Sequence, residues 1–253
     1  MAVEWITPDW PAPSSVRALS TQRGGGVSGY PFESLNLGAH VGDVAGDVAE
    51  NRRRLRQEAG LPAEPAWLSQ VHGTLVADLD RFDGRDLAGA VPSADAAITR
   101  RPGRICAILT ADCLPVLFAS EMGDAVAAAH AGWRGLAAGV LEAAVAALRV
   151  EPRCLLAWLG PAIGPAHFEV GPEVREALVQ GDPGAESAFA TNSRGRFMAD
   201  LPALARSRLA RLGIERVYGG RACTYRSGDQ YFSHRRDGKT GRQATLIWLD
   251  NRG

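Results

Sequence analysis

A cysteine and a histidine stand at the two ends of a predicted β-hairpin in the middle of the chain. Cys113 precedes the apolar run Leu114 to Ala119, and the second apolar run, Ala125 to His130, ends on the histidine. The five residues between the runs are polar and include Gly123, which suits a short hairpin loop. Folding there brings Cys113 opposite His130 or within a residue or two of it. Opposed Cβ atoms lie about 4.5–5.5 Å apart, so one metal ion could bridge the two side chains.

A third metal ligand has to come from elsewhere in the chain, and His72 is the histidine that we select. It follows the apolar pair Trp67-Leu68 and precedes Gly73, a small residue that leaves room for a ligand. The histidines that rank lower lie in Gly-rich coil, in a loop after a proline, and among arginines: His40, His167 and His234. Two histidines, one cysteine and a vacant fourth position are typical of a catalytic zinc ion.

Two other interpretations of Cys113 and His130 stay open. Sixteen residues lie between them, and the chain has neither Cys-x-x-Cys nor His-Glu-x-x-His, so no short metal motif is present. Free cysteine is among the most buried residue types, and the pair could be a small core residue and a hydrogen-bonded core histidine. A metal-free Cys–His nucleophilic pair is the second alternative. A one-residue change of register would put the side chains on opposite faces.

A turn rich in glycine follows His130 directly and is a candidate site for an oxyanion. Two glycines flank Trp133 and Arg134, and the apolar run Leu136 to Leu148 after them is predicted to be a helix. A strand, a glycine-containing turn and a helix N-terminus present free backbone N–H groups and the positive end of the helix dipole. Arg134 can add a bidentate contact. The alternative is that Trp133 only packs and Arg134 is a surface charge.

The elements that must position these residues alternate irregularly. Strands are predicted at Arg104 to Thr110, Leu114 to Ala119, Ala125 to His130, Cys154 to Leu159 and Thr245 to Leu249. Helices are predicted at Asp47 to Gly60, Leu136 to Leu148 and Leu201 to Leu212. At least one strand pair is joined by a tight turn, which favours an α/β (α+β) fold of mixed sheets flanked by helices over a strict βαβ repeat. No repeat or linker divides the chain, so we expect one domain over residues 1–253.

Composition and charge exclude several classes of protein. The 253 residues include 28 basic and 28 acidic side chains. Proteins that bind nucleic acid or an anionic membrane normally carry a basic surplus, so we expect neither partner. The N-terminus lacks the apolar region of a secretory signal, and no apolar run reaches the ~20 residues of a membrane-spanning helix. Four unclustered cysteines fit a reducing compartment, so a cytoplasmic location is expected.

Several segments resemble sequence blocks of one bacterial family, the laccase-domain or YfiH/YlmD family, whose members are also called multicopper polyphenol oxidases. The central blocks are Gln70-Val71-His72-Gly73, Ala111-Asp112-Cys113-Leu114-Pro115 and His130-Ala131-Gly132-Trp133-Arg134-Gly135. Further blocks follow the family order over nearly the whole chain: Thr21-Gln22-Arg23-Gly24-Gly25, Ser34-Leu35-Asn36-Leu37-Gly38, Gly160-Pro161-Ala162-Ile163-Gly164 and Phe232-Ser233-His234-Arg235-Arg236-Asp237-Gly238. The chain departs from the family pattern at Gln22, at Ala166-His167-Phe168 and at His234, which leaves substrate preference open.

The resemblance implies a purine nucleoside phosphorylase that splits adenosine, inosine and methylthioadenosine with phosphate and also deaminates adenosine. It implies a metal, zinc or copper, held by His72, Cys113 and His130, and a single α/β domain. The small-molecule partners would be purine nucleosides and phosphate. Five histidines without a His-x-His pair cannot supply a multicopper cluster, so polyphenol oxidase remains an alternative only through the family label.

Phosphorolysis requires an oriented phosphate, a purine pocket and stabilisation of an oxocarbenium-like ribose. We expect Arg23 and Arg134 to hold phosphate and Asn36 to contact a base edge or a ribose hydroxyl. Asp112 is a candidate general acid or hydrogen-bond partner of a histidine ligand, with a turn-capping aspartate as the alternative.

Two other functions use the same residues or none of them. With Cys113 as nucleophile and His130 as base, the protein would be an amidase acting on peptidoglycan precursors, since some family members are labelled peptidoglycan-editing factors. A non-catalytic binding module is the remaining alternative.

Overall fold

The computed structural model describes residues 2–82 and 93–250, and within them the strands form three sheets. The four-stranded sheet has the order β1 (Trp5–Ile6), β2 (Val16–Thr21), β13 (Gln243–Leu249) and β5 (Ile105–Thr110). The six-stranded sheet has the order β12 (Val217–Gly219), β8 (Leu155–Leu159), β6 (Leu114–Ser120), β7 (Val126–Ala131), β4 (Ala96–Thr99) and β3 (Val76–Asp78). The small sheet has the order β10 (Phe189–Thr191), β11 (Phe197–Ala199) and β9 (Glu169–Val170).

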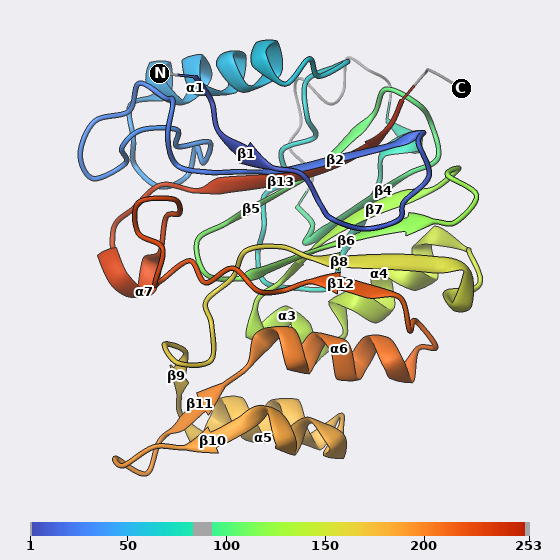
Figure 1. The fold of residues 1–253 in the computed structure, drawn as a ribbon, viewed down its shortest axis with the longest axis vertical. Coiled ribbons are helices and arrows are strands. Elements are labelled where there is room, and N and C mark those ends of the chain that lie inside the picture. Colours follow the sequence, from blue (N-terminus) through green and yellow to red (C-terminus); the bar gives the residue numbers. More distant parts are fainter. Residues whose placement is uncertain (1, 83–92, 251–253) are drawn as a thin grey trace.

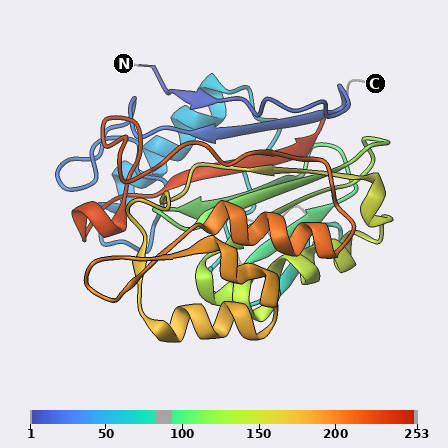
Figure 2. The same ribbon diagram turned by 60° about the horizontal axis from the view of Figure 1, so that its bottom comes forward.

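Helices cover the outer faces of the two large sheets. The helices of the described residues are α1 (Ala45–Glu58), α3 (Trp133–Ala138), α4 (Val140–Leu148), α5 (Pro172–Gln180), α6 (Leu201–Arg211) and the short α7 (His234–Asp237), with 3-10 turns at Leu79–Arg81, Pro152–Cys154 and Pro183–Ala188. Figure 1 shows α1 on one side of the sheets and α3, α4 and α6 on the other. Figure 2 shows α5 and α6 brought forward in front of the strands.

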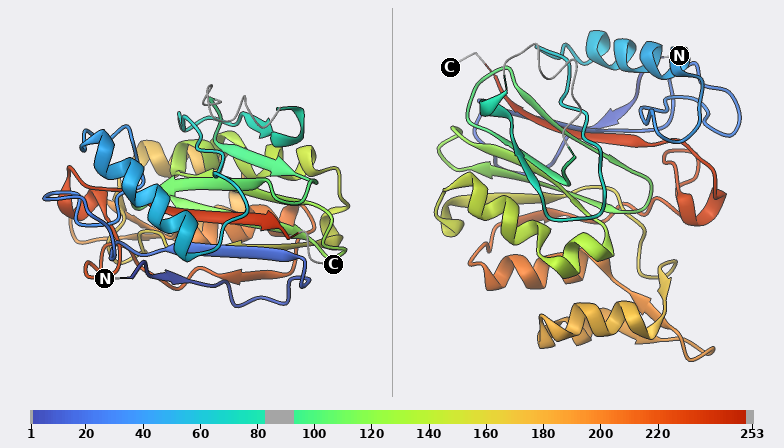
Figure 3. Two further views of the ribbon diagram at one scale, coloured as in Figure 1. Left: turned by 90° about the horizontal axis from the view of Figure 1, so that it is seen from above. Right: turned by 180° about the vertical axis from the view of Figure 1, so that it is seen from behind.

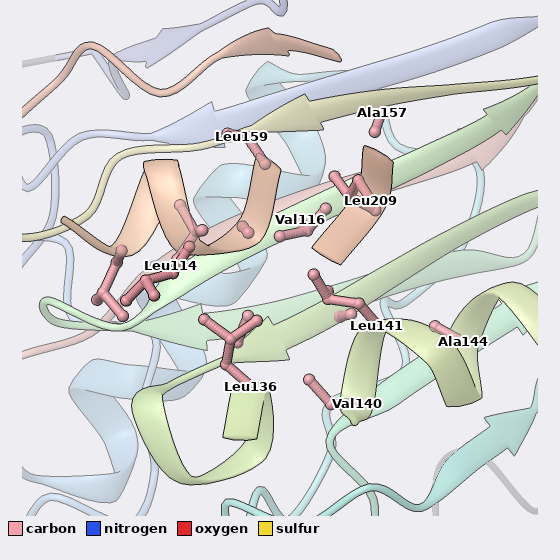
Figure 4. Close-up of a cluster of buried hydrophobic side chains, with 14 of the residues drawn as sticks. Leu114, Val116, Leu136, Val140, Leu141, Ala144, Ala157, Leu159 and Leu209 are labelled. Atoms are coloured by element: carbon pink, nitrogen blue, oxygen red, sulfur yellow. The ribbon is translucent and has the colours of Figure 1, made fainter. Parts of the chain in front are cut away.

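The central strand β6 is buried on both faces, which explains its continuous apolar sequence. Its alternate residues Val116 and Phe118 belong to the core cluster that includes the α3, α4 and α6 side chains. Leu117 and Ala119 point the other way, into a cluster shared with residues of the four-stranded sheet such as Ile108. A strand packed against layers on both sides has no polar face. Its successive apolar residues therefore point alternately into one cluster and into the other. Figure 4 shows the helix side of this core.

A third apolar cluster packs α1 against the outer face of the four-stranded sheet. Leu55 of α1 is fully buried there, beside Leu19 of β2 and Leu246 of β13. The view from above in Figure 3 shows α1 crossing over the strands. The molecule is therefore layered as helix, sheet, sheet and helices.

The fold is the mixed α/β arrangement that the sequence predicts. In the six-stranded sheet β6 runs antiparallel to β7 and β8, whereas β12 is parallel to β8 and β3 is parallel to β4. All five predicted strands are present, with ends that differ by at most two residues. The helix at Leu201 is also confirmed, and its predicted cap Asp200 accepts a hydrogen bond from the Ala203 N–H at 2.9 Å. The polar helix predicted from Asp47 begins two residues earlier, at Ala45.

The prediction of one continuous helix from Leu136 to Leu148 was wrong. The helical segment begins at Trp133 and is divided by Gly139, whose φ of 98° is left-handed. The Gly139 N–H donates to the Gly135 carbonyl at 3.0 Å and ends α3, as a glycine commonly does at a helix C-terminus. Apolar periodicity alone did not reveal this break. In the described residues, no helix combines the length and the apolar character needed to span a membrane.

Candidate metal centre

The β6–β7 hairpin brings Cys113 and His130 to the same face of the six-stranded sheet. The register pairs Leu114 with Ala131 and Pro115 with His130. Continued by one position beyond Leu114, it places Cys113 opposite Gly132, diagonally next to His130. Residues two apart on a strand share a face, so the predicted approach of the two side chains is confirmed.

His72 completes a cluster of three potential ligands. One ligand atom from each of His72, Cys113 and His130 lies within 4.8 Å of the others. Cys113 Sγ is 3.9 Å from His72 Nε2, and the two imidazole centroids are 4.8 Å apart with their planes at 66°. Zinc bonds of about 2.3 Å to sulfur and about 2.0 Å to nitrogen together exceed the 3.9 Å separation, so one ion can bind both atoms. His130 is buried and His72 is exposed, so the cluster opens on the His72 side.

Gly132 lies directly against the side chains of Cys113 and His72. A Cβ atom on Gly132 would lie 2.9 Å from Cys113 Sγ and 3.0 Å from His72 Cδ2. Real Cβ atoms rarely approach other atoms so closely, and the alanine side chain would have to push the two ligands apart. The glycine in the turn after His130 therefore makes room for the cluster itself.

A buried carboxylate that the sequence analysis missed lies directly behind the two histidines. Asp95 Oδ1 is 2.9 Å from His130 Nδ1 and accepts the His72 N–H at 2.9 Å. Its other oxygen accepts the N–H groups of Gly73 at 2.7 Å and Val71 at 3.2 Å. Burial raises the pKa of Asp95, but the hydrogen bonds from His130, Gly73 and His72 outweigh burial and lower it. In the sequence, the feature that could have pointed to Asp95 is its position directly before the apolar run that begins at Ala96.

The ionisation of Cys113 and His130 is coupled. Burial raises the pKa of the Cys113 thiol, but the charge and hydrogen bonds of His130 and His72 outweigh it and lower the pKa to about 6. Burial lowers the pKa of His130, while Cys113 and Asp95 raise it to about 9. Without an ion, these opposite shifts favour the thiolate form of Cys113 and the imidazolium form of His130. The thiolate is the form of cysteine that binds metals and attacks electrophiles.

Asp112 lies beside Cys113 but turns toward other partners. Its Oδ1 accepts the Thr224 hydroxyl at 2.6 Å and its Oδ2 accepts the Arg235 N–H at 2.7 Å. The expected hydrogen bond to a histidine ligand is made by Asp95 instead, because Asp112 has a φ of 91° at the turn into β6 and is held by Thr224 and Arg235. The two contacts agree with the turn-capping alternative, and the general-acid role of Asp112 stays a prediction.

The two arginines expected to hold phosphate are both in contact with aromatic rings. The Arg134 guanidinium lies 4.3 Å from the centroid of the Trp133 ring and its residue is exposed. Arg23 donates from Nε to the Glu33 carbonyl at 2.8 Å and from Nη1 to the Gly228 carbonyl at 2.9 Å, and it stacks on Phe232. Helix α3, which begins at Trp133, has only six residues. Phosphate binding by Arg23 and Arg134 stays a prediction.

Asn36 is fully buried and its amide is saturated by the protein. Its Nδ2 donates to the Gly38 carbonyl at 3.2 Å and to Asp43 Oδ2 at 2.8 Å, and its Oδ1 accepts the N–H groups of Gly38 and Arg242 at 2.9 Å each. These four bonds use the two donors and two lone pairs of the amide. Asn36 thus holds two chain segments together, and contact with a nucleoside would require it to exchange one of these bonds.

Arg242 adds positive charge near the cluster and is a neighbour of His40, and the sequence analysis assigned neither residue to the site. Burial lowers the pKa of Arg242, while the charges of Cys113 and Asp112 act in the opposite direction. Burial also lowers the pKa of His40, and the positive charges of Arg242, Arg52 and His130 lower it further. A half-buried cation beside an open ligand cluster favours anionic molecules. The signal for Arg242 was its position four residues after the family block that ends at Gly238.

Comparison with known proteins assigns the chain to a protein family. The family described as "Multi-copper polyphenol oxidoreductase laccase" matches residues 17–250. The chain belongs to this family. Purine nucleoside phosphorylase YfiH of Escherichia coli (strain K12) is 52% identical over 244 residues, covering 96% of this chain and 98% of the relative. Purine nucleoside phosphorylase PA4543 of Pseudomonas aeruginosa is 54% identical over 248 residues, covering 98% and 99%.

Solved structures of this laccase-like family have the same fold. Neisseria meningitidis protein NMB0706 is 50% identical, with a TM-score of 0.92 and coverage of 98% of this chain and 100% of that one. YlmD from Geobacillus stearothermophilus is 33% identical, with a TM-score of 0.91 and coverage of 98% and 97%. Within residues 2–82 and 93–250, His72, Cys113 and His130 are the only group of three or more His, Cys, Asp or Glu side chains arranged to hold an ion. The described part of this chain thus offers one such centre, despite the plural copper of the family description.

Proposed function

We propose that the chain is a metal-dependent purine nucleoside phosphorylase, with one domain over residues 1–253. It cleaves inosine, adenosine and methylthioadenosine with phosphate and deaminates adenosine as a side activity. The observation that carries the proposal is the ligand cluster of His72, Cys113 and His130, open at His72, in a chain about half identical to relatives named purine nucleoside phosphorylase. We place the enzyme in the cytoplasm, with nucleosides and phosphate as its partners.

The ligand set fits zinc, and copper is the alternative metal. Two imidazoles and one thiolate leave a fourth position for substrate in a tetrahedral site. The lowered pKa of Cys113 keeps the sulfur ionised at neutral pH, which is the state required for coordination. When bound, the ion supplies a Lewis acid at the open end of the cluster.

Charged residues around the cluster account for the use of phosphate. The Arg242 cation attracts the phosphate dianion, and Arg134, exposed in the first turn of α3, adds a second guanidinium. A phosphate oxygen attacks C1′ of the ribose, the glycosidic C–N bond breaks, and the purine leaves with a proton. Asp112 is our candidate for a group that moves this proton. The products are the free base and ribose 1-phosphate.

The test is product analysis with metal-loaded protein. Inosine and phosphate should yield hypoxanthine and ribose 1-phosphate by chromatography, and omission of phosphate should stop the reaction. His72→Ala is the matched control because it removes a ligand whose side chain is exposed. Equal amounts of hypoxanthine from the wild type and His72→Ala would defeat the proposal.

A second function is favoured by the ionisation of the metal-free cluster. A Cys113 pKa near 6 beside a His130 pKa near 9 resembles a Cys–His nucleophilic pair, which would support an amidase acting on peptidoglycan precursors. Zinc analysis combined with alkylation separates the two functions. Near-stoichiometric zinc that protects Cys113 supports the phosphorylase, and a metal-free, rapidly alkylated Cys113 supports the amidase.

A further inference from the structure

Asp95 contacts both histidines of the cluster, one through its ring and the other through its backbone. The Asp95 side chain has 0% exposure, and each of its oxygens accepts two hydrogen bonds. We infer that Asp95 is a positioning residue: it holds His130 with Nε2 toward Cys113 and fixes the loop that carries His72. This inference rests on the proposed metal centre and assigns a role to a residue outside the ligand set.

The contact with His130 is built into the sheet. Strands β4 and β7 are antiparallel with Ala96 opposite Ala129, so the next pair in register is Asp95 and His130. The His130 N–H donates to the Asp95 carbonyl at 2.7 Å, and the side chains meet at 2.9 Å between Oδ1 and Nδ1. An ionised carboxylate only accepts hydrogen bonds, so the imidazole donates from Nδ1. In the neutral imidazole, which is the form that binds metals, the other ring nitrogen, Nε2, is then free for an ion.

The contact with His72 passes through three successive backbone N–H groups. Val71, His72 and Gly73 all donate to the same carboxylate, which makes this segment a small anion-binding nest. His72 has a φ of 62°, a left-handed conformation that residues other than glycine adopt rarely. The carboxylate compensates for that conformation by satisfying the N–H groups that it turns inward. The imidazole of His72 is exposed, and its position is therefore fixed through the backbone hydrogen bonds to Asp95.

A carboxylate is required here because all four partners are donors. In Asp95→Asn the amide NH₂ must face either the Val71 and Gly73 N–H groups or the His72 N–H and His130. In the first orientation the loop loses two hydrogen bonds and moves. In the second, His130 has to accept at Nδ1, which transfers its proton to Nε2 and blocks the nitrogen that faces Cys113. Both orientations damage the ligand cluster without removing a ligand.

The experiment compares zinc affinity, measured by competition with a chromophoric chelator, in wild type, Asp95→Asn and Asp182→Asn. Asp182 is a matched control, since it is also buried and accepts the Ser207 hydroxyl at 2.7 Å but lies directly before the 3-10 turn Pro183–Ala188 and next to α6. Loss of a carboxylate that orients a histidine ligand typically weakens metal binding about 10–100-fold. We expect a loss of that size for Asp95→Asn and unchanged affinity for Asp182→Asn. Equal affinities in Asp95→Asn and wild type would overturn the inference.

A second measurement is independent of how well the variant folds. In long-range ¹⁵N–¹H spectra of the zinc-loaded wild type, His130 should carry its proton on Nδ1. A proton on Nε2 would overturn the inference. These results can be distinguished from those that test the proposed function. Weaker zinc binding in Asp95→Asn, in a protein that shows no phosphorolysis, supports the positioning role alone. Phosphorolysis by the wild type, with the same zinc affinity in Asp95→Asn, supports the enzyme alone. A wild type that binds no zinc contradicts both.

Discussion

The two halves of the ligand cluster are built in different ways. Cys113 and His130 are held by the β6–β7 hairpin in the middle of the six-stranded sheet, where neighbouring strands are paired on both sides. His72 comes from an exposed loop outside the named strands, which is tied to the sheet by hydrogen bonds to Asp95. The local sequence pattern is therefore enough to predict that the two ligands on the hairpin lie close together. The loop-held ligand depends on a distant carboxylate.

Removal of a sheet-held ligand should have the largest effect. We expect Cys113→Ala to lose zinc and to reduce phosphorolysis by more than about 100-fold, because loss of a ligand should exceed the 10–100-fold effect of losing a group that only orients one. Zinc content and initial rates measure this. Cys154→Ala is the control, since Cys154 is a half-buried free thiol at the start of β8 and lies outside the cluster. Unchanged zinc content and an unchanged rate of phosphorolysis in Cys113→Ala would contradict the role of the cluster in catalysis.

Crowding the space between the two halves should have the next largest effect. Gly132→Ala places a Cβ atom 2.9 Å from Cys113 Sγ and 3.0 Å from His72 Cδ2, so it must separate the ligands. Displacement of reacting groups by about 1 Å can cost up to about 100-fold in rate, and we expect a loss of about 10–100-fold. Gly29→Ala is the control, because nothing lies within 4 Å of a Cβ atom built there. Equal rates for the two variants would show that the cluster tolerates a wider spacing.

The pH dependence of alkylation sharpens the description of the sheet-held half. In metal-free protein, the Cys113 thiolate should form as pH rises through about 6, so its alkylation rate should reach half of its maximum there. Cys154 should react only at higher pH, because the hydrogen bond from its thiol to Glu121 raises its pKa. Mass spectrometry of peptides alkylated between pH 5 and 9 measures both. A Cys113 rate that still rises steeply above pH 8 would contradict the thiolate–imidazolium pair.

The smallest expected effect concerns the acid stability supplied by the loop anchor. The pKa of Asp95 is lowered in the folded protein, so ionised Asp95 stabilises the fold above the ordinary aspartate pKa of about 3.9. This contribution is lost as pH falls through the lowered folded-state pKa. Urea unfolding at several pH values should show a weaker pH dependence for Asp95→Asn than for wild type. Parallel curves would mean that the Asp95 carboxylate gains nothing on folding.

The sequence predicted the hairpin half of the centre for local reasons. Two apolar runs and a polar loop with Gly123 set the pairing of β6 with β7, and this pairing alone brings Cys113 to His130. The selection of His72 relied on a small neighbouring residue, and the structure places it in the same cluster. Five core strands could be predicted because they are continuous and apolar.

The rest of the centre depends on contacts between segments distant in sequence. Asp95 meets His130 through pairing of β4 with β7, strands that are separated in the chain by β5 and β6. Arg242 reaches the site from the far end of the chain, where its backbone N–H is held by Asn36. Helix division at Gly139 depends on a left-handed φ that apolar periodicity does not report. Local patterns contain none of this information.

The burial of β6 on both faces has a consequence for how an ion is exchanged. Opening the cluster from the hairpin side requires rupture of interstrand bonds in the interior of the protein, an event comparable in free energy to unfolding. Local opening of the exposed loop that carries residue 72 requires much less free energy. We therefore expect an ion to enter and leave the proposed centre past residue 72, and we expect its residence time to depend on how firmly that single imidazole is held.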